Sequence, residues 1–242
     1  MLATAFSSRH YLPLLFRTQK NKVWAYIDVL SITNRLGESV CDGLLGMHAL
    51  SGCDSTSKFA GHGKKAAWKL MENEEFCTAM KRLGDRFEPD NQTLKEVERS
   101  VCQLYNFGQF TNNNQVRCAK WNRQTTDVTK LPPCHDSVVL HIKRANYQTA
   151  VWKRALMREM NAPSPHGNGW IVNRNDITIS WMSQPYAPPQ VLDIVKCSCK
   201  AILPCSTKKC RCRKQGRPCM VICESNDDCC NAEDVEQQSD TD

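Results

Sequence analysis

Nine cysteines close to the C-terminal end are the side chains of this sequence with the most specific chemistry. Cys-x-Cys occurs twice among them, and short gaps separate the others. Thiolates this close together repel one another unless a soft cation shares them, and tetrahedral zinc is the usual cation in such sites. We therefore expect a metal centre with the ligands Cys197, Cys199, Cys205, Cys210, Cys212, Cys219, Cys223, Cys229 and Cys230.

The same spacing is compatible with a disulfide-bonded knot, so the redox environment must decide between the two chemistries. Residues 1–9 have neither a basic start nor a long apolar run, so we expect no secretory signal. The 15 cysteines are an odd number, and the six outside the cluster are scattered. Both features are typical of free thiols in a reducing compartment, which favours metal over disulfides.

Cationic side chains fill the gaps between these cysteines. No Asp or Glu interrupts the stretch from Lys196 to Cys223. Positive charge beside thiols lowers their pKa values, and an outward cationic surface attracts the phosphates of nucleic acid. We expect phosphate contacts from Lys208, Lys209, Arg211, Arg213 and Lys214.

The run from Lys196 to Asn231 resembles the CXC (tesmin-like) cysteine-rich module. That resemblance implies nine cysteines around three zinc ions, and DNA binding. The chain departs from the family pattern where residues 224–228 precede the adjacent Cys229 and Cys230, and where Lys209 replaces a tyrosine of many DNA-binding members. We therefore expect two or three Zn²⁺ ions and contact with the DNA duplex backbone that selects weakly for sequence.

The charge of the whole chain also favours an acidic partner. The formal net charge is +7 and the isoelectric point is near 8.7. Acidic residues are concentrated in residues 232–242, which we expect to be a disordered tail that either improves solubility or competes with phosphate for the basic patch. No apolar run reaches the roughly 18 residues of a membrane span, so we expect no membrane contact.

A second motif combines glycine, lysine and an acid. Gly61, Gly63, Lys64 and Lys65 precede an alanine-rich helix, and Asp54 lies seven residues before the first glycine. A glycine turn before a helix exposes backbone N–H groups, which suits a phosphate, and the two lysines add charge. The glycines and lysines are therefore candidate nucleic-acid contacts.

With its flanks, from Tyr26 to Met71, this motif resembles the helix-hairpin-helix part of PIN/FEN-like nucleases. The resemblance implies that Asp54 matches one metal-binding carboxylate and that Gly61 and Gly63 match the hairpin that grips duplex backbone. The family's upstream Asp-x-Asp pair has no counterpart here. Because cleavage needs a cluster of acids around Mg²⁺, we expect a truncated remnant without catalysis, in which Asp54 is a structural acid or a relic ligand.

The middle of the chain has helical periodicity. Apolar residues recur at helical spacing between Leu94 and Tyr105, and again from Asp136 to Leu156, with Asp136 or Ser137 as the expected N-cap. A basic face of the second helix is either solvated or extends a nucleic-acid track; it contains His141, Lys143, Arg144, Lys153, Arg154 and Arg158. We expect short strands at residues 171–172 and 177–181, and a stiff linker from Pro185 to Pro189.

The whole pattern predicts a mainly α fold with minor β structure, followed by a small irregular zinc cluster. We expect a PIN/FEN-like segment at 1–125, a helix with β-like connectors at 126–190, the zinc module at 191–231 and the acidic tail at 232–242. The sequence after Leu131 also resembles a multi-copy group of invertebrate proteins related to mobile elements. We therefore expect a nuclear, zinc-dependent DNA-binding protein of mobile-element origin; the alternatives are a fragment of a metal-dependent nuclease and a protein–protein adaptor.

Overall fold

The chain forms two compact units, which are described separately. In the computed structural model, Met1–Ser183 make up the first unit and Gln184–Asp242 the second. The described residues are 15–20, 22–121, 130–174, 176–184, 196–200, 203–214, 216, 218–219, 223–225 and 229–231. The expected acidic tail, the expected proline-rich linker and the expected boundary at residue 125 lie outside these residues.

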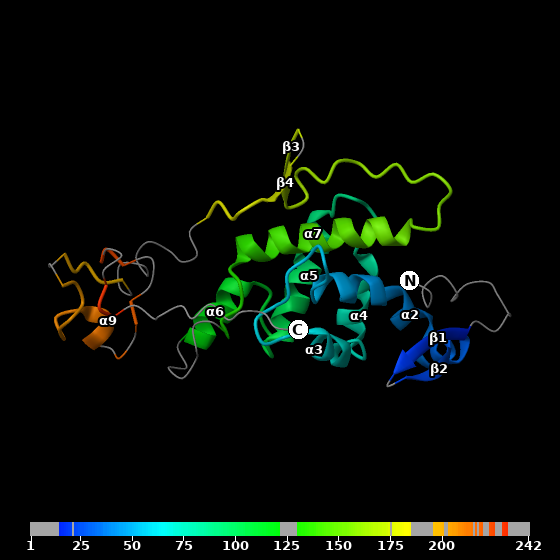
Figure 1. Cartoon of the computed structure of the whole chain (residues 1–242), viewed down its shortest axis with the longest axis horizontal. Coiled ribbons are helices and arrows are strands. Elements are labelled where there is room, and N and C mark those ends of the chain that lie inside the picture. Colours follow the sequence, from blue (N-terminus) through cyan, green and yellow to red (C-terminus); the bar gives the residue numbers. More distant parts are fainter. Residues whose placement is uncertain are drawn as a thin grey trace. The chain divides into compact units, whose positions relative to one another are not determined.

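The prediction of a mainly α fold with minor β structure is confirmed (Figure 1). The first unit is built from helices and two small antiparallel hairpins. The hairpins pair β1 (Leu15–Lys20) with β2 (Val23–Asp28) and β3 (Trp170–Asn173) with β4 (Asp176–Ile179). The helices are α2 (Val29–Leu50), α3 (Lys64–Leu70), α4 (Glu74–Arg82), α5 (Asn91–Leu104), α6 (Asn113–Trp121) and α7 (His135–Lys153).

Helix α2 begins after a side-chain cap and is interrupted at a glycine. Asp28 is its N-cap, and the carboxylate accepts a hydrogen bond of 3.0 Å from the backbone N–H of Ser31. Gly37 interrupts the helix with φ +78°, a conformation that glycine adopts without strain. Asp28 therefore has a capping role, and it stands at the opposite end of α2 from Asp54.

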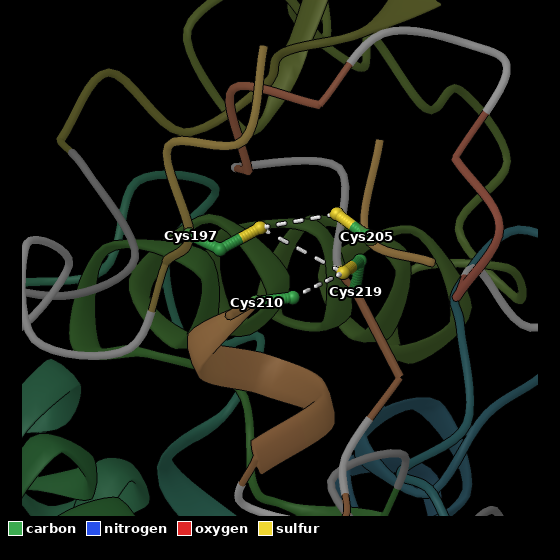
Figure 2. Close-up of side chains that lie close together, drawn as sticks. All are labelled: Cys197, Cys205, Cys210 and Cys219. Atoms are coloured by element: carbon green, nitrogen blue, oxygen red, sulfur yellow. Dashed lines mark hydrogen bonds between the residues drawn. The ribbon is translucent and has the colours of Figure 1, made fainter. Parts of the chain in front are cut away.

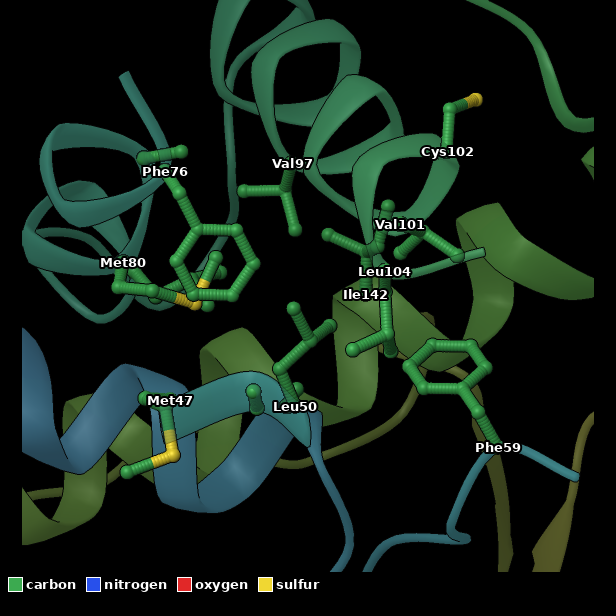
Figure 3. Packing of buried hydrophobic residues seen from close by; sticks show 14 of the residues in the cluster. Met47, Leu50, Phe59, Phe76, Met80, Val97, Val101, Cys102, Leu104 and Ile142 are labelled. Carbon is green, nitrogen blue, oxygen red and sulfur yellow. The ribbon is translucent and has the colours of Figure 1, made fainter. Parts of the chain in front are cut away.

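The core of the first unit lies between α2, α4, α5 and α7 (Figure 3). Leu50, Met80, Val101 and Ile142 supply one buried apolar side chain from each of these helices. Gly46 packs so closely on the carbonyl of Met80 that an added Cβ would overlap it, which brings the backbones of α2 and α4 together. Because α7 shares this core with α2, the predicted division near residue 125 does not separate two cores.

Buried Glu98 connects three helices. Its carboxylate accepts a hydrogen bond of 2.9 Å from the backbone N–H of Asn113 and lies 2.9 Å from Nδ1 of His135. A carboxylate is rarely buried without such partners, because the loss of hydration must be offset. The pairings thus fix α5 to the first residues of α6 and α7.

The expected basic face of α7 does not form. Four of its six cationic side chains instead donate hydrogen bonds to backbone carbonyls of neighbouring segments, and His141 and Arg144 are buried. The donor and acceptor pairs are His141 with Leu50, Arg144 with Gly169, Lys153 with Lys81 and Arg154 with Gly84. These four side chains fasten neighbouring segments to a central helix, although Lys153 is also exposed to solvent.

The structure also differs from the predictions at the start of α7 and at the end of β4. Helix α7 begins at His135 after Cys134, whereas Asp136 or Ser137 was the expected N-cap. The carboxylate of Asp136 accepts the backbone N–H of Ser183 at 2.7 Å instead. Strands β3 and β4 lie close to their expected positions, but Trp181 falls outside β4 and is exposed. Among the described helices none is long and apolar enough to cross a membrane.

His141 makes the stability of the first unit sensitive to acid. Burial lowers the pKa of His141 to about 4, while Nε2–H donates to the Leu50 carbonyl at 2.8 Å. The unfolded chain binds a proton at this imidazole below its ordinary pKa of about 6.5, so the folded state is fully favoured only above that pH. We expect the free energy of unfolding to fall by about 3 kcal/mol as the pH drops from 6.5 to 4.

Urea unfolding followed by helical circular dichroism at several pH values measures this effect. His141→Gln should flatten the decline between pH 6.5 and 4 while lowering stability at pH 7, because the imidazole packing is lost. His166→Gln is the matched control, since His166 is exposed. An equally steep decline in His141→Gln and the native chain contradicts the assignment.

Candidate metal centre

The second unit has little regular structure, and backbone hydrogen bonds connect its segments. Its described helix is the single turn α9 (Arg211–Lys214). The N–H of Cys219 donates to the carbonyl of Asn231 at 2.6 Å, and that of Glu224 donates to the carbonyl of Cys197 at 2.9 Å. The second bond brings Cys197 close to Cys223, although the two lie more than twenty residues apart in the chain.

One group of four sulfurs comes from Cys197, Cys205, Cys210 and Cys219, and Figure 2 shows their side chains pointing toward one another. The sulfur of Cys197 lies 3.6 Å from that of Cys205 and 3.7 Å from that of Cys219. The sulfurs of Cys210 and Cys219 are also 3.7 Å apart. Zn–S bonds of about 2.3 Å in a tetrahedron place sulfurs roughly 3.8 Å apart, so the group matches the size of a zinc site.

A second group of four consists of Cys197, Cys212, Cys219 and Cys223. The sulfurs of Cys212 and Cys223 are 3.6 Å apart. Cys197 and Cys219 belong to both groups, so six cysteines form two adjoining sets of four ligands. In each group all four sulfurs lie within 4.8 Å of one another. The cluster could therefore hold metal ions.

The thiols of the cluster differ in how readily they lose a proton. Burial opposes ionisation of Cys197, but hydrogen bonds from neighbouring thiols outweigh it and lower its pKa to about 6. Burial raises the pKa values of Cys205, Cys212 and Cys219 well above the ordinary value. The thiolate form is therefore favoured at Cys197 and disfavoured at Cys205, Cys212 and Cys219. A bound metal ion would supply the positive charge that ionises the others.

Three of the nine predicted ligands fall outside the two groups. Cys199 and Cys229 are half-buried beside the cluster, whereas Cys230 is exposed. No disulfide joins any of the 15 cysteines. Within the described part of the second unit the sulfurs form two sets of four, and no third set includes these three residues.

Arg213 has a different role from the one expected. Its Nε donates to the carbonyl of Cys205 at 2.7 Å, and Nη2 donates to the carbonyl of Cys230 at 2.7 Å. The guanidinium thus connects two segments of the module. Nothing in the spacing of the sequence distinguishes Arg213 from its basic neighbours, since an arginine–carbonyl contact depends on the folded backbone. Lys208, Lys209, Arg211 and Lys214 are exposed, as expected for phosphate contacts.

Two further polar contacts were not predicted. The side-chain amide of Asn231 donates to the sulfur of Cys219 at 3.4 Å, which favours the thiolate form of a shared ligand. A carboxylate of Glu224 lies 3.5 Å from Nζ of Lys196 and 3.8 Å from that of Lys200. Glu224 balances positive charge at the start of the module. The exposed positive charge therefore lies along residues 208–214.

The glycine and lysine motif of the first unit has a less suitable geometry. Gly61 has φ +72°, but Gly63 has an ordinary extended φ of −94° and precedes α3, which has only seven residues. The ammonium of Lys64 donates to the carbonyl of Gly52, while Lys65 is exposed. A cavity of about 420 Å³ adjoins the motif, lined by Ser51, Gly52, Cys53, Thr56, Lys58, Gly63 and Lys64.

Asp54 is exposed in the turn after α2. In the part of the chain that the structure describes, the candidate metal groups contain cysteines alone, and Asp54 belongs to none of them. Comparison with family models, with curated proteins and with solved structures finds no match to this chain. The cysteine cluster is therefore the site with the best-defined chemistry.

The two shared cysteines make the metal content sensitive to single substitutions. We expect the native chain to hold two or three zinc ions. Cys219→Ser should lose about two ions because it removes a ligand from both groups, whereas Cys212→Ser should lose about one. Metal analysis of the purified chains by mass spectrometry measures the content.

Cys118→Ser is the control, since Cys118 is exposed on α6 in the first unit. It should keep the native zinc content. Less than one zinc per native chain, or equal losses in Cys212→Ser and Cys219→Ser, contradicts the shared arrangement.

Proposed function

We propose that residues 196–231 form a zinc-dependent module that binds DNA with weak sequence selectivity. The observation that carries this proposal is the combination of two four-sulfur groups with exposed cations on one short segment. Cys210 and Cys212 stand between Lys208, Lys209, Arg211 and Lys214 in the sequence. Metal at the sulfurs would therefore hold these cations in place around the cluster.

Weak selectivity is proposed because the module offers charge without an element that reads bases. Lysine and arginine attract phosphates of any sequence, whereas discrimination requires side chains placed against base edges in a groove. Helix α9 has four residues, which is short for a helix that enters the major groove. The module would thus bind through the phosphate backbone.

The proposal keeps three interpretations of the sequence. The cysteine spacing supports a CXC-like module, and the proposed DNA binding would be consistent with a nuclear location. Derivation from a mobile element rests on the resemblance of the segment after Leu131 to the invertebrate group. A protein–protein adaptor is the alternative outcome of the binding experiment below.

Reversing the charge of exposed lysines in the cysteine-rich module should weaken DNA binding without loss of zinc. The variant Lys208→Glu/Lys209→Glu should lower affinity for any duplex, and the slope of log affinity against log salt should become shallower by about 2. Arg213 is left unchanged because its guanidinium connects the module internally. Fluorescence anisotropy with labelled duplexes of two unrelated sequences, at several salt concentrations, measures both quantities.

Lys69→Glu/Lys95→Glu is the charge-matched control, because both lysines are exposed on the first unit. It should have a smaller effect on affinity and on the salt slope. If the two double variants bind equally well, the phosphate-binding surface lies elsewhere. If the native chain binds no duplex at low salt but does bind other proteins, the module is a protein–protein adaptor and not a DNA-binding module.

Cleavage of DNA is not expected. A two-metal reaction needs several carboxylates around ions roughly 4 Å apart, whereas Asp54 is an exposed acid outside every candidate metal group of the described residues. Incubation of flap and hairpin DNA with the chain and Mg²⁺ or Mn²⁺ should leave the substrates intact. Metal-dependent nicking that Asp54→Ala abolishes would establish a nuclease instead.

A further inference from the structure

The hairpin of β1 and β2 presents exposed apolar side chains, among them Phe16, Trp24 and Tyr26. Every residue of β2 is exposed, and Figure 1 shows the hairpin leading into the start of α2. A two-stranded hairpin with no apolar face buried is marginally stable in water. Exposed aromatic side chains on such an element indicate a surface that contacts a partner.

Register divides the hairpin into two different faces. Arg17 pairs with Tyr26 and Gln19 with Trp24, so these four side chains share one face. Trp24 is 51% exposed and Tyr26 is 62% exposed. The guanidinium carbon of Arg17 lies 3.6 Å from the centre of the Trp24 ring. This face therefore carries two aromatic rings roughly 7 Å apart along one strand, with a planar cation stacked on one of them.

Charge decides which partner fits this aromatic face. The described side chains of the hairpin include the cations of Arg17 and Lys22, and the one acid, Asp28, is occupied as the N-cap of α2. A second copy would bring the same cations together, which is unfavourable. A polyanion with flat apolar groups is complementary to both the cations and the rings.

We infer that the face formed by Arg17, Trp24 and Tyr26 binds single-stranded nucleic acid by stacking unpaired bases. Aromatic side chains and arginine planes on a sheet accept bases in this way, and neighbouring cations hold the phosphates. In a duplex the bases are stacked on one another, so their faces are not available to these rings. The surface does not involve the zinc module, and its test is independent of the function proposed above.

The test uses the full zinc-loaded chain and a labelled single-stranded oligothymidine, with a duplex of similar length for comparison. Tyr26→Thr keeps a residue that favours strands but removes the ring. It should lower affinity for the single strand by about 5- to 100-fold and leave duplex affinity unchanged. Because stacking is uncharged, the difference between native and variant chains should persist at high salt. Tyr26→Phe should bind like the native chain.

Trp181→Thr is the matched control, since Trp181 is 82% exposed in the first unit but lies outside the hairpin. It should not change single-strand affinity. Circular dichroism of each variant checks that the helices remain. Unchanged single-strand affinity in Trp24→Thr/Tyr26→Thr overturns the inference. A native dimer that this double variant converts to a monomer, as measured by sedimentation equilibrium, overturns it in favour of a second copy as the partner.

Discussion

Burying a polar or ionisable group without a partner is costly, and both units of this protein are organised by that constraint. In the first unit, α7 lies in the core although it is rich in cations, because its side chains reach the carbonyls at the ends of neighbouring elements. Glu98 is tolerated for the same reason. In the second unit the buried groups are thiols, and no carbonyl or amide network could satisfy several thiolates at once. A metal ion could do so, and in the described part of that unit the cysteines form the buried cluster.

The sequence predicts the helices and the cysteine cluster better than it predicts the tertiary contacts of individual side chains. Helical periodicity correctly indicates α5 and α7, and cysteine spacing correctly indicates a cluster, because both signals are local. The roles of His141, Arg144 and Arg213 could not be predicted, because each depends on a carbonyl brought close by tertiary packing. Helix α7 was expected to have a polar face since charged residues usually face water, but here packing on two sides overrides that preference. The hairpin of β1 and β2 was not predicted, because β1 (Leu-Phe-Arg-Thr-Gln-Lys) lacks a continuous apolar run.

The glycine and lysine motif near α3 and the cysteine-rich module both contain cations, and the surroundings of these cations can be compared. Near α3, the ammonium of Lys64 is directed to a carbonyl of its own unit, and Gly63 has neither an unusual φ nor a neighbour that would exclude a side chain. In the cysteine-rich module Arg213 bonds to two backbone carbonyls, while Lys208, Lys209, Arg211 and Lys214 are exposed. In both motifs, therefore, a cation that meets a backbone carbonyl bonds within its own unit, and its neighbours are exposed.

The hydrogen bonds of Arg213 imply that loss of metal would not change the number of positive charges on the module but would change where they are held. Loss of metal would leave the charge of the module on the chain, so long-range attraction to a polyanion would persist. The carbonyls of Cys205 and Cys230 would no longer be held on either side of the guanidinium, and the exposed lysines would sample many arrangements. Ordering them again at a phosphate surface would then cost conformational entropy that the folded module has already lost. Metal in this protein would thus hold the positive side chains in place for binding, and it would not itself be the main source of the attraction to phosphate.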